Sequence, residues 1–152
     1  MSIDYQEYEQ ACEKIRASNQ LLLDDFAAYL ERSGFSERTA YKHQSNIEFY
    51  INEYLLYDDA VPPEEGLNGD YVSMFLGYWF IKKALWASKT SIKSNATSFK
   101  KFGKFLFERG QIDIEDFESI TEIIREEMPE WLDTLARYDD PSVEGYEDIW
   151  EY

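Results

Sequence analysis

The apolar positions of this chain recur at helical spacing almost throughout. Tyr5, Tyr8, Cys12 and Ile15 are three or four residues apart, which places them on one face and predicts a helix over about 4–16. No stretch alternates apolar and polar residues in the sustained way that a strand requires. The pattern therefore predicts an all-α protein.

Short polar signals mark where further helices begin and end. Asn19 is placed to cap a second helix, and Gly34 to end it in a left-handed turn. Ser36 is a plausible N-cap for a third helix that continues to about Leu55. The prolines and glycines of residues 58–70 then predict a loop.

The second half of the chain predicts three more helical segments. The first covers about 70–84 and is apolar on most sides, so we expect it deep in the bundle. The next covers 89–109, with Ser88 as its N-cap and Gly110 at its end. The last is one helix, or two helices broken near Pro129.

This pattern predicts an orthogonal bundle of four to five helices, followed by a C-terminal helix and an acidic tail. We divide the chain into an N-terminal helix, the bundle, a helical extension and the tail, at residues 1–18, 19–112, 113–138 and 139–152. The tail carries no helical stripe, and we expect it to be disordered or docked only by Tyr146, Ile149 and Trp150.

Charge is distributed unevenly along the sequence. The net charge is −16, which argues against nonspecific nucleic-acid binding by the whole surface. Residues 82–109, however, carry eight basic side chains and one acidic one, while residues 1–81 and 111–152 are strongly acidic. Such asymmetry says more about partners than the total does.

The basic residues of the helix predicted over 89–109 share one face. Lys89, Lys93, Lys100 and Lys104 fall within an arc of about 60° at 100° per residue, beside an apolar stripe, and Lys101 widens the arc. A solvated face of an acidic protein normally mixes glutamates with its lysines. Three interpretations stay open: a solvated helix face, a surface that contacts phosphates, or a surface that docks an acidic segment such as the chain's own tail.

Helix caps and apolar spacings give the chain a family resemblance over about residues 20–112. The sequence resembles the core-binding, SAM-like N-terminal domain of tyrosine recombinases and phage integrases. The landmarks that carry the resemblance are Phe26, Leu30, Gly34, Ser36, Thr39, Phe49, Phe75, Leu76, Ser88, Ser91, Phe99, Phe105, Leu106 and Gly110.

The resemblance implies a four-helix bundle that clamps one face of DNA through the N-terminal halves of two helices. Carried over to this sequence, the residues implied to contact duplex DNA are Arg38, Thr39, Lys42, Lys89, Ser91, Lys93, Lys100 and Lys104. The first three also lie near a helix N-terminus, which favours phosphate.

The chain departs from the family where catalysis would lie. The family's catalytic domain needs a His-x-x-Arg pair, whereas the single histidine here, His43, is followed by Gln-Ser-Asn. We therefore expect a non-catalytic DNA-binding module and no enzyme. The alternative is a protein-interaction or regulatory module that kept the bundle but not DNA binding, with the acidic C-terminal region autoinhibitory or partner-binding. A DNA mimic is a third, weaker option.

Other chemistry finds little support. No Cys or His cluster surrounds His43, so we expect a surface or half-buried histidine and not a metal ligand. We expect Cys12 to be a small core residue. No metal or cofactor site is expected. The N-terminus does not resemble a signal peptide and no apolar run is long enough to span a membrane, so we expect a cytoplasmic protein.

Overall fold

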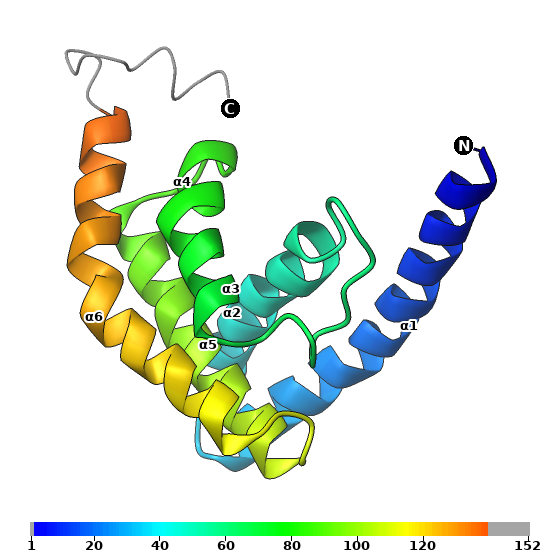
Figure 1. Cartoon of the computed structure of the whole chain (residues 1–152). Helices are drawn as coiled ribbons and strands as arrows, with labels where there is room; N and C mark the ends of the chain where they lie inside the picture. The colour runs from blue at the N-terminus through cyan, green and yellow to red at the C-terminus, as the bar shows by residue number, and fades with distance from the viewer. Residues whose placement is uncertain (1, 140–152) are drawn as a thin grey trace.

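The structure, a computed structural model, describes residues 2–139, and in this range it contains helices and no strand (Figure 1). The all-α prediction is therefore confirmed for these residues. In chain order the elements are α1 (Ser2–Arg32), α2 (Glu37–Phe49), the π-helical η1 (Tyr50–Tyr54), α3 (Gly69–Met74), the π-helical η2 (Phe75–Trp79), α4 (Phe80–Lys83), α5 (Lys89–Glu108) and α6 (Ile114–Asp139).

The first helix differs from the prediction because α1 is continuous through Asn19. The Asn19 side chain is only 1% exposed, and its Nδ2 atom donates to Oδ1 of Asn52, 2.8 Å away. The amide thus joins α1 to the segment after α2 instead of capping a helix. The predicted helix start at Asn19 is wrong.

The other predicted helix ends are confirmed. The side chain of Ser36 accepts a hydrogen bond from the backbone N–H of Thr39, and Ser88 forms a reciprocal capping box with Ser91. Gly34 and Gly110 adopt φ angles of 101° and 78°, a left-handed region that favours glycine.

Helix α6 runs unbroken through Pro129, which settles the choice between one helix and two. In Figure 1, α6 and α1 form two diverging arms, and the remaining helices lie between them. Segments α3, η2 and α4 form one continuous helix that packs against α6.

Aromatic rings fill the core between these helices. Tyr50 is fully buried, its ring makes edge contacts with Phe75 and Phe99, and its hydroxyl donates to the carbonyl of Gly66 at 2.6 Å. The helix predicted over 70–84 is buried at Val72, Phe75, Leu76, Trp79, Phe80 and Ile81. It nevertheless exposes Met74 and Tyr78 on its outer side.

Within residues 2–139 no helix combines the length and the apolar character needed to cross a bilayer. The tail predicted from Asp139 lies outside the described residues except for Asp139 itself, which belongs to α6. The docking residues expected there, Tyr146, Ile149 and Trp150, also lie outside them.

Candidate nucleic-acid interface

The lysines that share an arc in the sequence share an exposed face of α5. Lys89, Lys93, Lys100 and Lys104 are all exposed. The opposite side of α5 is buried, with Phe99 and Leu106 in the core. The predicted division of this helix into a core stripe and a lysine stripe is therefore confirmed.

Helix α2 lies antiparallel to α5 and extends the basic surface. Residue numbers rise along α2 while those of its contacts on and before α5 fall: Phe35 lies beside Lys101, His43 beside Ser98, and Phe49 beside Trp86. The start of α2 therefore meets the end of α5. Exposed Arg38 and Lys42 thus lie toward the end of α5 that carries its last lysines.

Four side chains from the two helices bring their positive charges close together. Lys101 is half-buried, and its Nζ atom lies 4.2 Å from the centre of the Phe35 ring. Burial lowers the pKa of Lys101, and repulsion from Lys100, Lys104 and Lys42 lowers it further. This part of the surface therefore carries unrelieved positive charge.

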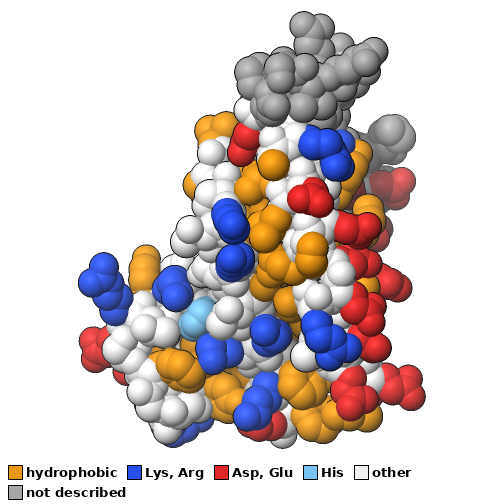
Figure 2. Space-filling view, turned by 90° about the vertical axis from the view of Figure 1, so that its left-hand side faces the viewer, with side chains coloured by type: hydrophobic (Ala, Val, Ile, Leu, Met, Phe, Trp, Pro, Cys, Tyr) orange, Lys and Arg blue, Asp and Glu red, His pale blue; other side chains and the backbone are white. Residues whose placement is uncertain are grey.

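We call the whole surface the basic face and define it as Arg38, Lys42, Lys89, Lys93, Lys100, Lys101 and Lys104. No carboxylate of residues 2–139 lies within 4 Å of a charged nitrogen of the basic face; the ion pair found in this range joins Arg109 and Asp25. Figure 2 shows Lys and Arg side chains spread across the face in view, while most of the Asp and Glu side chains visible there lie along its right-hand edge.

The residues implied to contact DNA do not form one tight cluster. Lys89 and Lys104 are separated by about 22 Å along α5, at 1.5 Å per residue. The N-terminal halves of α2 and α5 consequently lie toward opposite ends of the helix pair. Lys42, Lys100 and Lys104 all lie close enough to Lys101 to lower its pKa, whereas Lys89 is not among the charges that act on it.

Thr39 and Ser91 have local structural roles in the described part of the chain. The hydroxyl of Ser36 donates to Oγ1 of Thr39 at 3.1 Å, at the start of α2. Ser91 accepts from the backbone N–H of Ser88 at 2.8 Å, which completes the capping box of α5. Both hydroxyls help to fix the helix ends that carry the neighbouring cations.

A buried polar seam beneath the basic face was missed by sequence reasoning. Nδ1 of His43 lies 2.6 Å from Oγ of Ser98, and Nδ2 of Asn46 donates to Oγ of Ser98 at 2.9 Å and to Oγ of Ser94 at 3.1 Å. The expectation of a surface or half-buried His43 is wrong, because its side chain is 2% exposed between α2 and α5. The available signal was the spacing of Ser94 and Ser98, one helical turn apart beside the apolar stripe.

His43 is held neutral by its surroundings. Burial lowers its pKa to about 4, and the positive charges of Lys42 and Lys101 add to the effect. A neutral imidazole supports the basic face without contributing charge to it. No group of three or more His, Cys, Asp or Glu side chains that could hold a metal ion occurs in residues 2–139.

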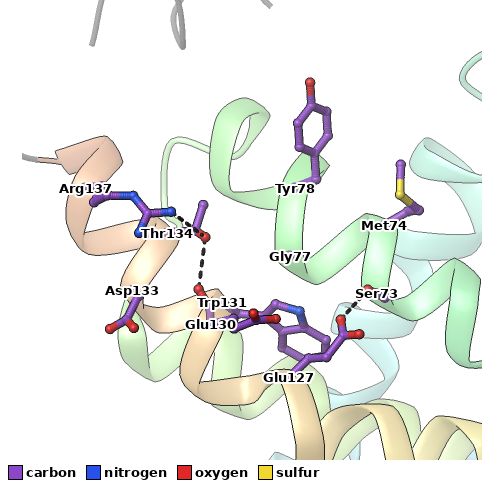
Figure 3. A pocket seen from close by; sticks show the side chains of 10 residues that line it. All are labelled: Ser73, Met74, Gly77, Tyr78, Glu127, Glu130, Trp131, Asp133, Thr134 and Arg137. Carbon is purple, nitrogen blue, oxygen red and sulfur yellow. Dashed lines mark hydrogen bonds between the residues drawn. The ribbon is translucent and has the colours of Figure 1, made fainter. Parts of the chain in front are cut away.

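A second surface feature is a groove between α6 and the continuous helix of α3, η2 and α4 (Figure 3). Its volume is about 490 Å³; Glu127, Glu130 and Asp133 line it with negative charge, and Arg137 contributes a single positive charge. Oγ of Ser73 donates to Oε1 of Glu127 at 2.5 Å across the groove. Exposed Met74 adds an apolar wall. We call this feature the acidic groove; its carboxylates make it opposite in charge to the basic face.

Close packing of Trp131 against Gly77 forms the base of the acidic groove. A Cβ atom at Gly77 would lie 2.6 Å from Cδ1 and Nε1 of the Trp131 indole. The absence of a side chain at Gly77 therefore lets α6 approach η2 closely.

Comparison with known proteins finds no relative: no protein family, no curated protein and no solved structure matches this chain at a significant level.

Proposed function

We propose that this chain is a non-catalytic module that binds duplex DNA through the basic face, and that its bundle has the SAM-like arrangement of a tyrosine-recombinase core-binding domain. One observation carries the proposal. The basic face holds seven cations on two packed helices, and no carboxylate of residues 2–139 forms an ion pair with any of them within 4 Å. The family resemblance over residues 20–112 supports the same assignment.

Duplex phosphates would relieve the repulsion among these cations. Each lysine that neutralises a phosphate releases a condensed counterion, which favours binding and makes it depend on salt. The lysines of α5 extend over about 22 Å, which is roughly two thirds of a B-DNA helical turn. The basic face is therefore long enough to meet several phosphates along one side of a duplex.

The support beneath the lysines suits this role. The capping box at Ser88 fixes the start of α5, and the polar seam fixes α5 against α2. A rigid helix pair presents its cations without a large ordering cost on binding.

The test compares two charge-matched double variants of the full chain. Lys93→Glu with Lys100→Glu alters the basic face, and Lys14→Glu with Arg125→Glu changes the same net charge at exposed positions on α1 and α6. Affinity for a fluorescent duplex is measured by anisotropy between about 50 and 200 mM salt, a range over which phosphate contacts lose affinity steeply.

We expect the basic-face variant to bind at least about tenfold more weakly and to depend less steeply on salt, because it has lost two phosphate contacts. The control variant should stay close to the parent chain. Equal losses in both variants would show that only total charge matters, and unchanged affinity in the basic-face variant would refute the proposal.

A second candidate function follows from the acidic groove. Its carboxylates and exposed Met74 fit a positively charged, partly apolar segment of a protein partner. Glu130→Lys with Asp133→Lys reverses the charge on the α6 side of the groove. If a partner isolated with the parent chain still binds this variant, the groove is not the interaction surface.

A further inference from the structure

An apolar pair of side chains stands beside the first turns of α5. Leu85 is 94% exposed and Trp86 is 55% exposed, on the connection between α4 and α5. The Trp86 ring is held edge-on against Phe49, with centroids 5.0 Å apart, and its carbonyl accepts from Oγ of Ser91 at 3.2 Å. Trp86 is thus held in place while it and Leu85 remain open to solvent.

Cations flank this apolar pair. Lys89 is the first residue of α5, and Lys93 follows one turn later on the same exposed arc. We call Leu85, Trp86, Lys89 and Lys93 the α5 shoulder. Such a surface fits a ligand that combines negative charge with apolar or aromatic side chains, because neither feature alone would cover both parts of it.

Helix α6 ends near the connection between α4 and α5. The hydroxyl of Tyr138 donates to the carbonyl of Lys82 at 3.3 Å, so α6 ends beside the last turn of α4. The last described residues of α6 therefore lie near the connection that carries the α5 shoulder. An extended segment with the length of residues 140–152 reaches about 40 Å, which exceeds the length of the lysine stripe.

The sequence of residues 140–152 has the required chemistry. It carries Asp140, Glu144, Glu147, Asp148 and Glu151, and it contains no lysine or arginine. Val143, Tyr146, Ile149 and Trp150 lie between these acids, and Tyr152 follows the last of them. The segment thus matches the α5 shoulder in both charge and apolar character.

We infer that residues 140–152 dock on the α5 shoulder in the same molecule and compete there with DNA; the competition rests on the proposed DNA binding, whereas the docking does not. A tethered segment meets its site at an effective concentration on the order of millimolar, so weak contacts are enough for substantial occupancy. DNA displaces the segment when its phosphates bind the same lysines more tightly.

The test uses the full chain and two sets of charge-neutralising substitutions. The tail variant carries Glu144→Gln, Glu147→Gln, Asp148→Asn and Glu151→Gln. The matched control neutralises four exposed acids of α6, through Glu115→Gln, Glu118→Gln, Glu122→Gln and Glu126→Gln. NMR signals of the Leu85 methyls and the Trp86 indole N–H report docking without DNA, and anisotropy reports duplex affinity.

We expect the Leu85 and Trp86 signals to shift in the tail variant and to stay in place in the control. The tail variant should also bind duplex DNA at least about tenfold more tightly than the control, because the lysines are no longer covered. Unchanged Leu85 and Trp86 signals in the tail variant overturn the docking, and equal gains in DNA affinity in both variants overturn the competition.

Two further outcomes separate this inference from the proposed function. If the signals shift in the tail variant but no form of the chain binds duplex DNA, the docking stands and the proposed DNA binding fails. If the signals of the parent chain depend on protein concentration, the segment docks on a second copy, which overturns docking within one molecule.

Discussion

Acidification should destabilise this protein through His43, and the effect can be separated from that of the carboxylates. The imidazole is 2% exposed, hydrogen-bonds with Ser98, and faces Lys42 and Lys101. The positive charges of both lysines oppose protonation of the ring. The folded state therefore holds His43 neutral where the unfolded chain would protonate it.

The direction and size of the effect follow from the two pKa values. The pKa of His43 falls from its ordinary value of 6.5 to about 4 on folding. The unfolded chain thus binds more protons between these values, and the stabilisation present above pH 6.5 is lost as the pH falls toward 4. Between pH 7 and pH 5 the loss from this group is about 2 kcal/mol.

The assay is urea unfolding at pH 7 and pH 5, followed by circular dichroism, for the parent chain and for His43→Gln. The glutamine cannot titrate, while carboxylates contribute equally to both proteins. We expect the parent to lose about 2 kcal/mol more than the variant over this range. The same loss in both proteins would show that His43 is not held neutral, and would refute the burial argument.

Two other substitutions test the packing and the caps. Gly77→Ala should destabilise the protein by about 1–3 kcal/mol in thermal unfolding, because its Cβ would meet the Trp131 indole at 2.6 Å. Gly103→Ala should destabilise it less, because the nearest contacts of its Cβ are at 3.3 Å. A larger loss for Gly103→Ala would contradict the close approach of α6 to η2. Ser88→Ala should cost about 1 kcal/mol by removing the capping box, a loss that chemical unfolding can measure.

The parts of the fold that could be predicted are those decided by neighbouring residues. Ser36 and Ser88 cap helices because a hydroxyl reaches the backbone three residues on, and Gly34 ends a helix because it tolerates a positive φ. Asn19 carries the same local signal, yet its amide bonds to Asn52 after α1 and α2 pack together. A cap signal is local, whereas the choice between a cap and a tertiary contact is not.

The π-helical segments show the same limit. Tyr50 begins η1, and its hydroxyl reaches the carbonyl of Gly66 in the following loop. Apolar spacing predicts that a helix continues through Tyr50, but it does not predict a wider turn there. That turn accompanies the packing of a large ring whose neighbours come from other helices.

The sequence predicts one part of the candidate interface and not the other. Periodicity alone places Lys93 and Lys100 on one face, because seven residues make about two helical turns. It does not reveal that Lys42 of α2 comes to the same surface as Lys101, since this depends on which side of α5 meets α2. The acidic groove is also beyond sequence reasoning, because its walls come from helices brought together only by the fold.

The polar seam between α2 and α5 has a further consequence for how the two helices are aligned. An interface of interchangeable Phe and Leu side chains can tolerate sliding by one turn, about 5.4 Å, with a similar apolar fit. A slide that brought Phe102 to the place of Ser98 would leave the buried imidazole of His43 without its hydroxyl partner. The seam therefore opposes sliding of α5 in that direction, and a hydrogen bond beneath the surface helps to set the distance between Lys42 and the lysines of α5.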